Sequence, residues 1–484
     1  MKIWVHACWI AAFGLIVGGI QLLSPTYYDS DTGYHLAVAR LVRAHGILQE
    51  FPWTPFSWLA DHYADKELLF HLLLAPLASL EPNLAARIAG AVLGTALLST
   101  LYAILVRERV LGAGWWTLAA LASSSGFVLR FSLVRPHLLS IPLALVITWA
   151  GIRRRWLVLG AACLLYPLCY TAWHLPLVLL GLVELARFVS ERRIDWRVPA
   201  LGAAGLALAI LLHPNFPNNL ALFWIQNFEV LFGTAWAGRA GFDMGPEFRP
   251  FMLAHIHRFM LIPALLACFA LPLAWRARSR DPLPLAVALV AAGFLLVTLR
   301  SQRFLEYLAP FAALALALAT SRTQRTAAWR DLGAWVFALS CLYTGLLGRG
   351  VFDRMALRVD PFPPAVAEAL RDAIPEGALV LTCDWDVTGR MMLALPERRF
   401  PVALDPVFFA RKDLERYQIW YDVVHAPPRH PAALLRETFD AEHVLCAKRR
   451  RALPLTQALS RDPGARLLHV SEHAVAFELA APAR

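Results

Sequence analysis

Long apolar stretches follow one another along the first 349 residues of this 484-residue chain. Hydrophobic residues make up 58% of the sequence and charged residues 17%, whereas soluble domains have roughly 45–50% apolar and about 25% charged residues. Since a run of about 20 apolar residues can cross a bilayer as a helix, we expect an α-helical polytopic membrane protein. The eleven predicted transmembrane helices are residues 3–23, 86–106, 113–130, 137–152, 156–172, 173–188, 198–213, 257–275, 283–299, 304–320 and 331–348.

Two apolar segments near the N-terminus have different predicted roles. Residues 3–23 are long enough to span, and no convincing small-residue cleavage site follows them. We therefore expect a retained membrane anchor. Residues 68–82 are short, and Pro76 interrupts them. We expect this second segment to lie along the membrane interface.

Basic loops between the apolar runs account for the net charge of +11. With Lys2 on the cytoplasmic side, the arginine-rich loops of successive spans fall on that same side, as the positive-inside rule requires. The loop 24–85, the loop 214–256 and the chain after about residue 350 then lie outside. No basic stripe with interleaved aromatic residues marks a soluble surface, so membrane lipids are expected partners and nucleic acid is not.

The composition changes at about residue 350, which divides the chain into a membrane domain, 1–349, and a soluble domain, 350–484. Short strands alternate with helical patterns in this tail, so we expect a small α/β domain with a largely parallel sheet. Cys383 and Cys446 can pair there in an oxidising compartment, although unpaired buried cysteines are the favoured interpretation. The predicted strands are Ala378–Thr382, Pro401–Leu404, His443–Cys446, Arg466–Val470 and Ala474–Glu478.

Asp29 and Asp31 stand one residue apart directly after the first apolar run. Two carboxylates at this spacing can bracket a divalent cation such as Mg²⁺ or Mn²⁺, or one can accept a proton from a reacting group. His35 follows one helical turn later and is a candidate substrate contact. The alternative is structural, with Asp31 capping a helix that runs from about Thr32 to His45.

Three arginines lie at outer ends of predicted spans: Arg135, Arg300 and Arg303. A guanidinium group binds phosphate in a bidentate manner, so these residues are candidate ligands for a donor phosphate. The alternatives are contact with lipid headgroups, or an ion pair between Arg303 and Glu306.

Further polar residues on the outer side form a predicted rim for substrate or acceptor, with no recognisable metal-binding spacing among them. Glu247 is also a candidate metal ligand, as is Asp31. Asp65 accompanies Glu67 as a supporting acid. The second D-x-D, Asp384-Trp385-Asp386, is interpreted as a turn. The rim residues are Glu67, His137, His174, Asn215 and Glu247.

Taken together, these motifs resemble the GT-C superfamily of polytopic glycosyltransferases, which includes the lipid A aminoarabinose transferases, protein O-mannosyltransferases and oligosaccharyltransferases. The likeness rests on the D-x-D after the first span, on Arg135-Pro136-His137 and on Arg303-Phe304-Leu305-Glu306-Tyr307. Trp173-His174 and His213-Pro214-Asn215 match two other family elements only in part. Trp173-His174 lacks the family's asparagine, and His213 replaces another asparagine.

The resemblance implies an inverting glycosyltransferase that moves a sugar from a polyprenyl-phosphate donor to a lipid, glycan or protein acceptor. Asp29 would be the general base, with Asp31 supporting it or holding a metal. The location implied is a bacterial inner membrane, with the C-terminal domain in the periplasm. The alternatives are a transporter or flippase for a lipid-linked substrate, which would show inverted repeats, and a non-catalytic membrane assembly subunit.

Overall fold

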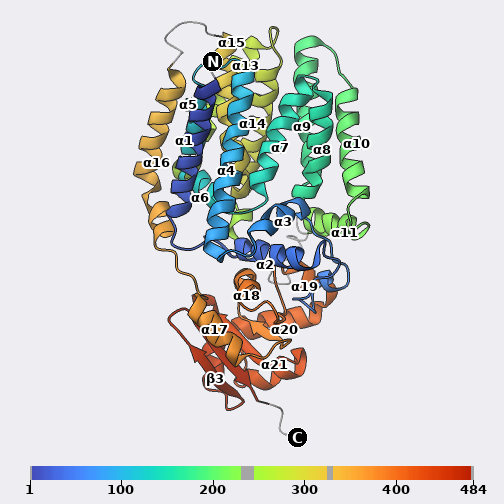
Figure 1. The fold of residues 1–484 in the computed structure, drawn as a ribbon, viewed down its shortest axis with the longest axis vertical. Coiled ribbons are helices and arrows are strands. Elements are labelled where there is room, and N and C mark those ends of the chain that lie inside the picture. The colour runs from blue at the N-terminus through green and yellow to red at the C-terminus, as the bar shows by residue number, and fades with distance from the viewer. Residues whose placement is uncertain (1–2, 230–244, 324–330, 481–484) are drawn as a thin grey trace.

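The computed structural model describes residues 3–229, 245–323 and 331–480, which form a helical bundle with a small α/β domain at one end (Figure 1). Each predicted apolar stretch coincides with a helix, or with two helices, of the bundle. The bundle helices are α1 (Ile3–Leu22), α4 (Pro82–Arg107), α5 (Ala113–Ala122), α6 (Ser125–Ser132), α7 (His137–Ile152), α8 (Trp156–Cys169), α9 (His174–Glu191), α10 (Arg197–Leu211), α13 (Leu253–Ala277), α14 (Leu283–Arg300), α15 (Leu305–Thr323) and α16 (Leu332–Ala356).

Among the described residues, six helices are long and apolar enough to cross a membrane: α1, α4, α13, α14, α15 with the residues just before it, and α16. The pair α6 and α7 makes a seventh candidate, bent by 113°. The polytopic membrane fold is therefore confirmed, whereas the count of eleven spans remains a prediction. The reason is length, because α8 and α10 have only 14 and 15 residues where a bilayer needs about 20.

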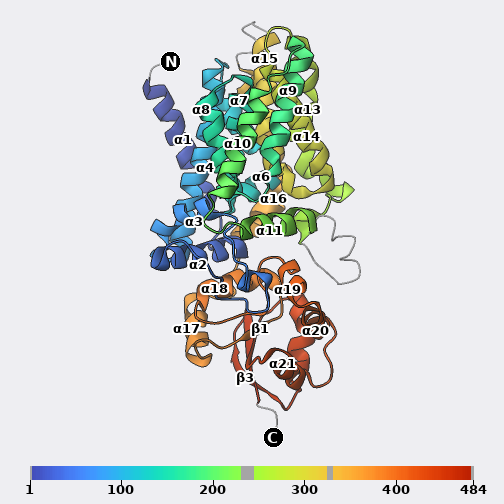
Figure 2. The ribbon, with the colours of Figure 1, turned by 90° about the vertical axis from the view of Figure 1, so that its right-hand side faces the viewer.

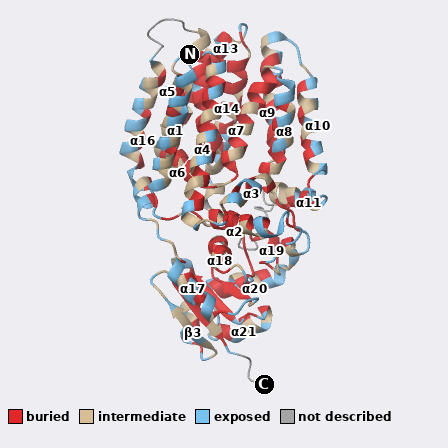
Figure 3. Cartoon of the chain, in the orientation of Figure 1, coloured by how far each residue is buried: buried red, intermediate tan, exposed pale blue. Residues whose placement is uncertain are grey.

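The centre of the bundle is α15, which α13 and α14 pack against. Its alanine-rich sequence lets neighbouring helices approach closely, and almost all of its residues are buried (Figure 3). By contrast, α1 buries only Phe13 and Val17, so most of its apolar surface faces outward. This distribution suits a helix in contact with lipid.

An ion-pair network joins four helices at the end of the bundle remote from the α/β domain. Arg153 and Arg322 each contact both Glu108 and Asp281, at distances from 2.5 to 2.9 Å. Since each charge has partners of opposite sign, part of the cost of removing these groups from water is offset, and loss of one partner would leave a carboxylate or guanidinium group unbalanced.

The C-terminal domain contains α17 (Pro364–Ala373), α18 (Thr388–Ala394), α19 (Val407–Lys412), α20 (Leu414–His425), α21 (Pro431–Phe439) and α22 (Leu453–Leu459). Its sheet has the order β1-β2-β4-β3. The strands are β1 (Val380–Thr382), β2 (His443–Ala447), β3 (Ala465–Val470) and β4 (Ala474–Leu479).

The prediction of a largely parallel sheet is wrong. Only β1 and β2 pair in parallel, whereas β4 runs antiparallel to both β2 and β3. The connection from Val470 to Ala474 is too short for a crossover, so β3 and β4 form a hairpin. Residues 401–404 form no strand. A disulfide joins Cys383 to Cys446, so the favoured interpretation of unpaired cysteines was also wrong.

Two short helices lie between the bundle and the α/β domain: α2 (Ser30–His45) and α3 (Leu68–Leu74). The short helix predicted at the interface, 68–82, is thus seen as α3 followed by a 3₁₀ turn. In the side view, α11 (Asn218–Trp224) lies on the bundle side of this boundary, and α18 and α19 lie on the other (Figure 2).

The α/β domain docks on α2 where two glycines meet. A Cβ atom at Gly33 would lie 2.9 Å from the carbonyl oxygen of Gly389, and one at Gly389 would overlap the carbonyl oxygen of Ser30. Next to this crossing, the backbone N–H of Arg390 donates to Ser30 Oγ at 3.2 Å, and its side chain donates to the carbonyl of Tyr27. The absence of side chains at the two glycines is what allows α18 to contact α2 this closely.

We expect Gly389→Ala to destabilise the protein by about 1–3 kcal/mol, because the new methyl group meets backbone atoms that cannot move aside. The measurement is the thermal unfolding midpoint of the detergent-solubilised protein. Gly350→Ala in α16 is the control, since no atom lies within 4 Å of its Cβ position. Equal midpoints for the two variants would contradict the close contact.

Candidate functional site

A cavity of about 560 Å³ lies between the foot of the bundle and the α/β domain. This volume is typical of small-molecule sites, which range over about 300–1,000 Å³. Both domains contribute charged side chains to its wall. Those from the bundle and the first outer loop are Asp29, Asp31, His35, Lys66, Glu67, Arg135, His137, Glu247 and Arg303, and those from the following chain are Arg358, Asp384, Asp386, Asp405, Arg449, Arg450 and Arg451.

Asp29 is the N-cap of α2, a role that the sequence analysis considered for Asp31. Its carboxylate accepts hydrogen bonds from the backbone N–H and the hydroxyl of Thr32 and forms an ion pair with Arg135. Burial acts to raise the pKa of Asp29, but Arg135 and Thr32 outweigh it and the pKa is lowered. Asp29 is therefore an ionised, firmly held carboxylate.

Asp31 faces the cavity, and 45% of its side chain is exposed there. Its Oδ2 atom lies 3.1 Å from Nη2 of Arg135, whereas Asp29 pairs with Nε of the same guanidinium group. Burial raises the pKa of Asp31 to about 6 despite Arg135, and the neighbouring charges of Asp29 and Glu247 act in the same direction. A carboxylate with this pKa and this access is able to accept a proton near neutral pH.

Arg135 reaches the cavity because the chain breaks between α6 and α7. Leu133 adopts an extended conformation after α6, and Pro136, directly after Arg135, is the N-cap of α7. Proline disfavours a helical conformation in the residue before it, so this break is encoded locally. His137, the first residue of α7, also lines the cavity and lies 2.9 Å from the carbonyl oxygen of Arg130.

Glu247 links three arginines at one side of the cavity. It lies 2.9 Å from Arg130, 3.2 Å from Arg135 and 3.7 Å from Arg303. Its loop is held by Ser301, which donates to the backbone carbonyl of Glu247 at 3.0 Å. Burial opposes ionisation of Glu247, yet the arginines keep its pKa well below the usual range.

Arg303 lies over the rings of Tyr170 and Phe248, at 5.7 and 5.4 Å from their centroids. Its buried Nε atom has no hydrogen-bond partner among the described residues. The alternative considered for it, an ion pair with Glu306, is not what the structure contains, because Glu306 pairs with Arg130 at 2.7 Å. Arg303 therefore keeps donor capacity for an anion in the cavity.

His35, Glu67 and His71 form a buried group whose ligand atoms lie within 4.8 Å of one another, so they can hold a metal ion. His35 Nδ1 lies 2.9 Å from His71 Nε2, and His71 Nδ1 lies 2.8 Å from the carboxylate of Asp65. Glu67 Oε2 is buried without a hydrogen-bond partner among the described residues. Burial lowers the pKa of His35 well below its usual value, so its ring is neutral, as metal binding requires.

This donor set distinguishes between the two cations expected from the sequence, Mg²⁺ and Mn²⁺. Two imidazoles and one carboxylate suit Zn²⁺ or Mn²⁺ better than Mg²⁺, and a carboxylate behind a ligating histidine is the usual supporting contact. The predicted metal ligands Asp31 and Glu247 are not in this group, because both pair with Arg135. A guanidinium group already balances the charge that a cation would balance there.

Three of the predicted site residues do not line the cavity. Arg300 is exposed at the end of α14, and His174 is exposed at the start of α9. Asn215 is buried, and its amide instead joins loops, accepting from the N–H of Asp65 and donating to the carbonyl of Leu48. The sequence spacing located these residues at the outer ends of helices but could not tell which side of each helix end they occupy.

Two residues that contact side chains of the cavity wall, Arg130 and His71, were missed. Arg130 lies within an apolar run and was counted as part of a span. His71 lies in the apolar segment assigned to the membrane interface. Asp384 and Asp386, interpreted as a turn, do begin a short 3₁₀ turn but also face the cavity, where Arg449 meets them.

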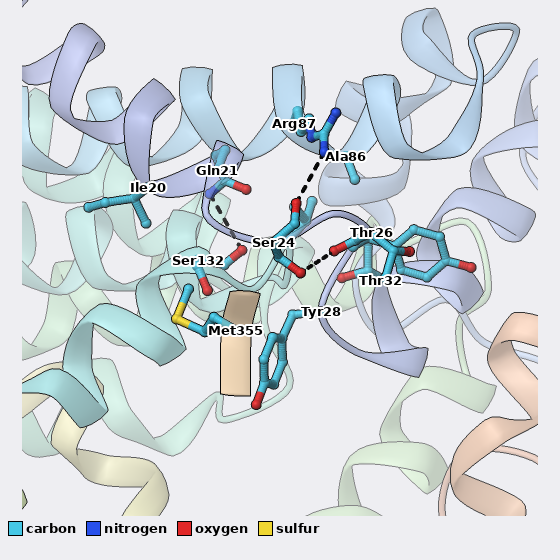
Figure 4. Close-up of a pocket in the computed structure, with 12 residues that line it drawn as sticks. Ile20, Gln21, Ser24, Thr26, Tyr28, Thr32, Ala86, Arg87, Ser132 and Met355 are labelled. Atoms are coloured by element: carbon cyan, nitrogen blue, oxygen red, sulfur yellow. Dashed lines mark hydrogen bonds between the residues drawn. The ribbon is translucent and has the colours of Figure 1, made fainter. Parts of the chain in front are cut away.

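A second, much smaller pocket of about 20 Å³ lies behind the loop that carries Asp29 (Figure 4). Its polar groups bind one another, since Ser24 donates to the carbonyl of Thr26 and Arg87 donates to the carbonyl of Ser24. This space is enough for about one water molecule. It lies next to the loop that carries Asp29 and is too small for a substrate.

Comparison with known proteins gives matches in structure alone: no family model and no curated protein matches the sequence. The crystal structure of ArnT from Cupriavidus metallidurans bound to undecaprenyl phosphate superimposes with a TM-score of 0.59 at 14% identity, covering 100% of both chains. The apo form of ArnT gives a TM-score of 0.57 at 13% identity, covering 99% of this chain and 100% of ArnT.

The arabinofuranosyltransferase AftD from Mycobacteria gives a TM-score of 0.58 at 16% identity. The match covers 98% of this chain but only 40% of AftD, so this chain spans less than half the length of that protein. At such low identities the likeness establishes the fold. The expected resemblance to GT-C glycosyltransferases is confirmed at that level.

We expect the purified protein to bind Zn²⁺ and the variant His71→Ala to bind it more than about tenfold more weakly. The measurement is equilibrium dialysis against Zn²⁺ followed by elemental analysis of the protein. His62→Ala is the control, because His62 is exposed and lies outside the His35, Glu67 and His71 group. If the two variants take up equal amounts of Zn²⁺, the buried group is not a metal site.

Proposed function

We propose that this protein is a membrane glycosyltransferase that moves a sugar from a polyprenyl-phosphate donor to an acceptor in the cavity between its two domains. The observation that carries the proposal is the convergence of Asp29 and Asp31 with Arg135 and Arg303 on one cavity at the foot of a membrane bundle. The fold adds support, because ArnT, which shares it, has been seen with undecaprenyl phosphate bound.

The donor phosphate would bind Arg135 and Arg303. When the bond between the sugar and the phosphate breaks, the polyprenyl phosphate leaves with the bonding electron pair and gains negative charge. Guanidinium groups that are already in position stabilise this charge without reorganising. The unpartnered Nε of Arg303 supplies a donor for it. Arg300, which is exposed outside the cavity, is better suited to lipid headgroups.

Asp31 is the better general base of the two aspartates. It faces the cavity and its pKa is raised to about 6, whereas Asp29 is held by Thr32 and Arg135. The attacking acceptor oxygen would lose its proton to Asp31 and form the new bond to the sugar in one step. Such a displacement inverts the configuration of the sugar carbon. Asp29, which was expected to be the base, would instead orient Arg135.

His35, Glu67 and His71 would hold a divalent cation if the enzyme uses one. The cation would supply a fixed positive charge at the wall that His35 and Glu67 line. Without it, the same side chains still connect α2 to α3, through the contact between His35 and His71.

The proposal includes the bacterial inner membrane as location and a periplasmic position for the α/β domain, as the basic loops predicted. Lipid, glycan and protein acceptors all remain compatible with a hydroxyl or amine nucleophile. A transporter or flippase is less well supported, since the α/β domain covers the cavity and contributes charged groups to its wall. The same charged wall argues against a non-catalytic assembly subunit.

We expect Asp31→Asn to lower the transfer rate by at least about 10²-fold, because the proton acceptor is lost. In the wild type the rate should rise with pH up to about 6, where Asp31 becomes ionised, and then level off. Both the effect of the substitution and the pH dependence are measured in proteoliposomes, by mass spectrometry of the undecaprenyl phosphate that is released from undecaprenyl-phospho-arabinose. Asp353→Asn is the control, because Asp353 lies outside the cavity. If Asp31→Asn keeps the full rate, Asp31 is not the base.

We expect Arg303→Gln to weaken binding of undecaprenyl phosphate by about tenfold or more, since a charge-assisted hydrogen bond contributes about 1.5–3 kcal/mol. Arg300→Gln is a matched control three positions away. It should bind like the wild type, because Arg300 lies outside the cavity. Fluorescence-detected thermal shift of the solubilised protein, titrated with undecaprenyl phosphate, measures both variants. Equal losses in the two variants would argue against Arg303 as the phosphate ligand.

A further inference from the structure

The wall of the cavity that faces α2 is basic. It belongs to the α/β domain and to the connection that follows α16, and its arginines come from two short segments far apart in the sequence. Those arginines are Arg358, Arg449, Arg450 and Arg451.

Arg449 pairs with two of the acidic groups of this wall. It lies 2.6 Å from Asp386 and 3.5 Å from Asp384. The disulfide between Cys383 and Cys446 holds the two segments that carry these groups next to each other. Among the described residues, Arg358 and Arg450 form no ion pair with either of these carboxylates.

Arg358 is placed for an anion. Its guanidinium group lies over the ring of Tyr28, at 5.1 Å from the ring centroid. Tyr28 is the residue directly before Asp29 in the sequence. Its Nε atom is buried and has no hydrogen-bond partner among the described residues. A buried guanidinium N–H that lacks an acceptor is unfavourable, so an oxyanion arriving in the cavity would gain a strong hydrogen bond there.

Arg450 offers a second site of positive charge. Its side chain is exposed at the cavity and forms no ion pair or hydrogen bond with another residue in the described part of the chain. Arg358 and Arg450 are therefore two cationic groups that line the same cavity as the carboxylates of the first outer loop.

The side from which the nucleophile must approach the sugar favours this wall as the acceptor site. An inverting displacement requires the nucleophile to approach from the side opposite the leaving phosphate. Arg135 and Arg303, the proposed phosphate ligands, come from the bundle, where a polyprenyl chain in the membrane would end. The acceptor then enters on the side of the α/β domain.

We propose that Arg358 and Arg450 bind an oxyanion on the acceptor, so that the enzyme glycosylates a sugar bearing a phosphate or a carboxylate. This inference rests on the proposed function, because it takes the opposite wall as the donor site. It gives the α/β domain a role in selecting the acceptor in addition to covering the cavity.

The test is isothermal titration of the full-length protein in detergent with three soluble probes: glucose 6-phosphate, glucuronate and glucose. The two anionic probes should bind and glucose should not, and the tighter anionic probe identifies the oxyanion. Arg358→Gln and Arg450→Gln should each weaken that binding by about tenfold, the loss expected from one charge-assisted hydrogen bond. Arg461→Gln, an exposed arginine of the same domain outside the cavity, should leave it unchanged.

A second titration, with undecaprenyl phosphate, separates the two phosphate sources. Arg303→Gln should weaken this lipid but not the sugar probes, and Arg358→Gln and Arg450→Gln should do the reverse. The inference is overturned if the sugar probes bind the Arg358 and Arg450 variants normally, if Arg303→Gln weakens them equally, or if glucose binds as well as they do. Failure of undecaprenyl phosphate to bind the wild type would instead reject the proposed donor, with sugar binding unaffected.

Discussion

The ion pair between Arg135 and Asp29 is the contact on which the site depends. It joins the start of α2 to the break between α6 and α7, two places more than a hundred residues apart in the chain. The same arginine reaches Asp31 and Glu247, so one guanidinium group contacts three carboxylates. Without such a partner, these carboxylates at the foot of an apolar bundle would be neutral or highly unfavourable.

The α/β domain belongs to the site and is not an appendage. Arg390 donates to the backbone of Tyr27 and, through its own N–H, to Ser30, the residue between the two aspartates. Gly33 and Gly389 bring the two helices into backbone contact at the same place. A shift of this domain would therefore move the loop that carries both aspartates, and would couple the proposed acceptor site to the position of the proposed base.

Much of the fold and part of the site could be predicted from the sequence, because consecutive residues determine the length of each apolar stretch and the positions where helices end. Asp29, Arg135 and Arg303 were found for this reason: each follows a helix end. His71 and Arg130 were not found, since each lies within an apolar stretch and acquires its partners only through tertiary packing. The antiparallel pairing of β3 and β4 depends on the three-residue turn between them. The pairing of Cys383 with Cys446 depends on which segments of the chain become neighbours in the folded domain.

The disulfide between Cys383 and Cys446 has a consequence for when the protein becomes competent. Cys383 directly precedes Asp384, and Cys446 lies three positions before Arg449. Thiols pair in this way in an oxidising compartment. If the wall that carries Arg449 and Arg450 binds the acceptor as proposed, its two segments are joined only once this bond has formed, which is a covalent maturation step after synthesis.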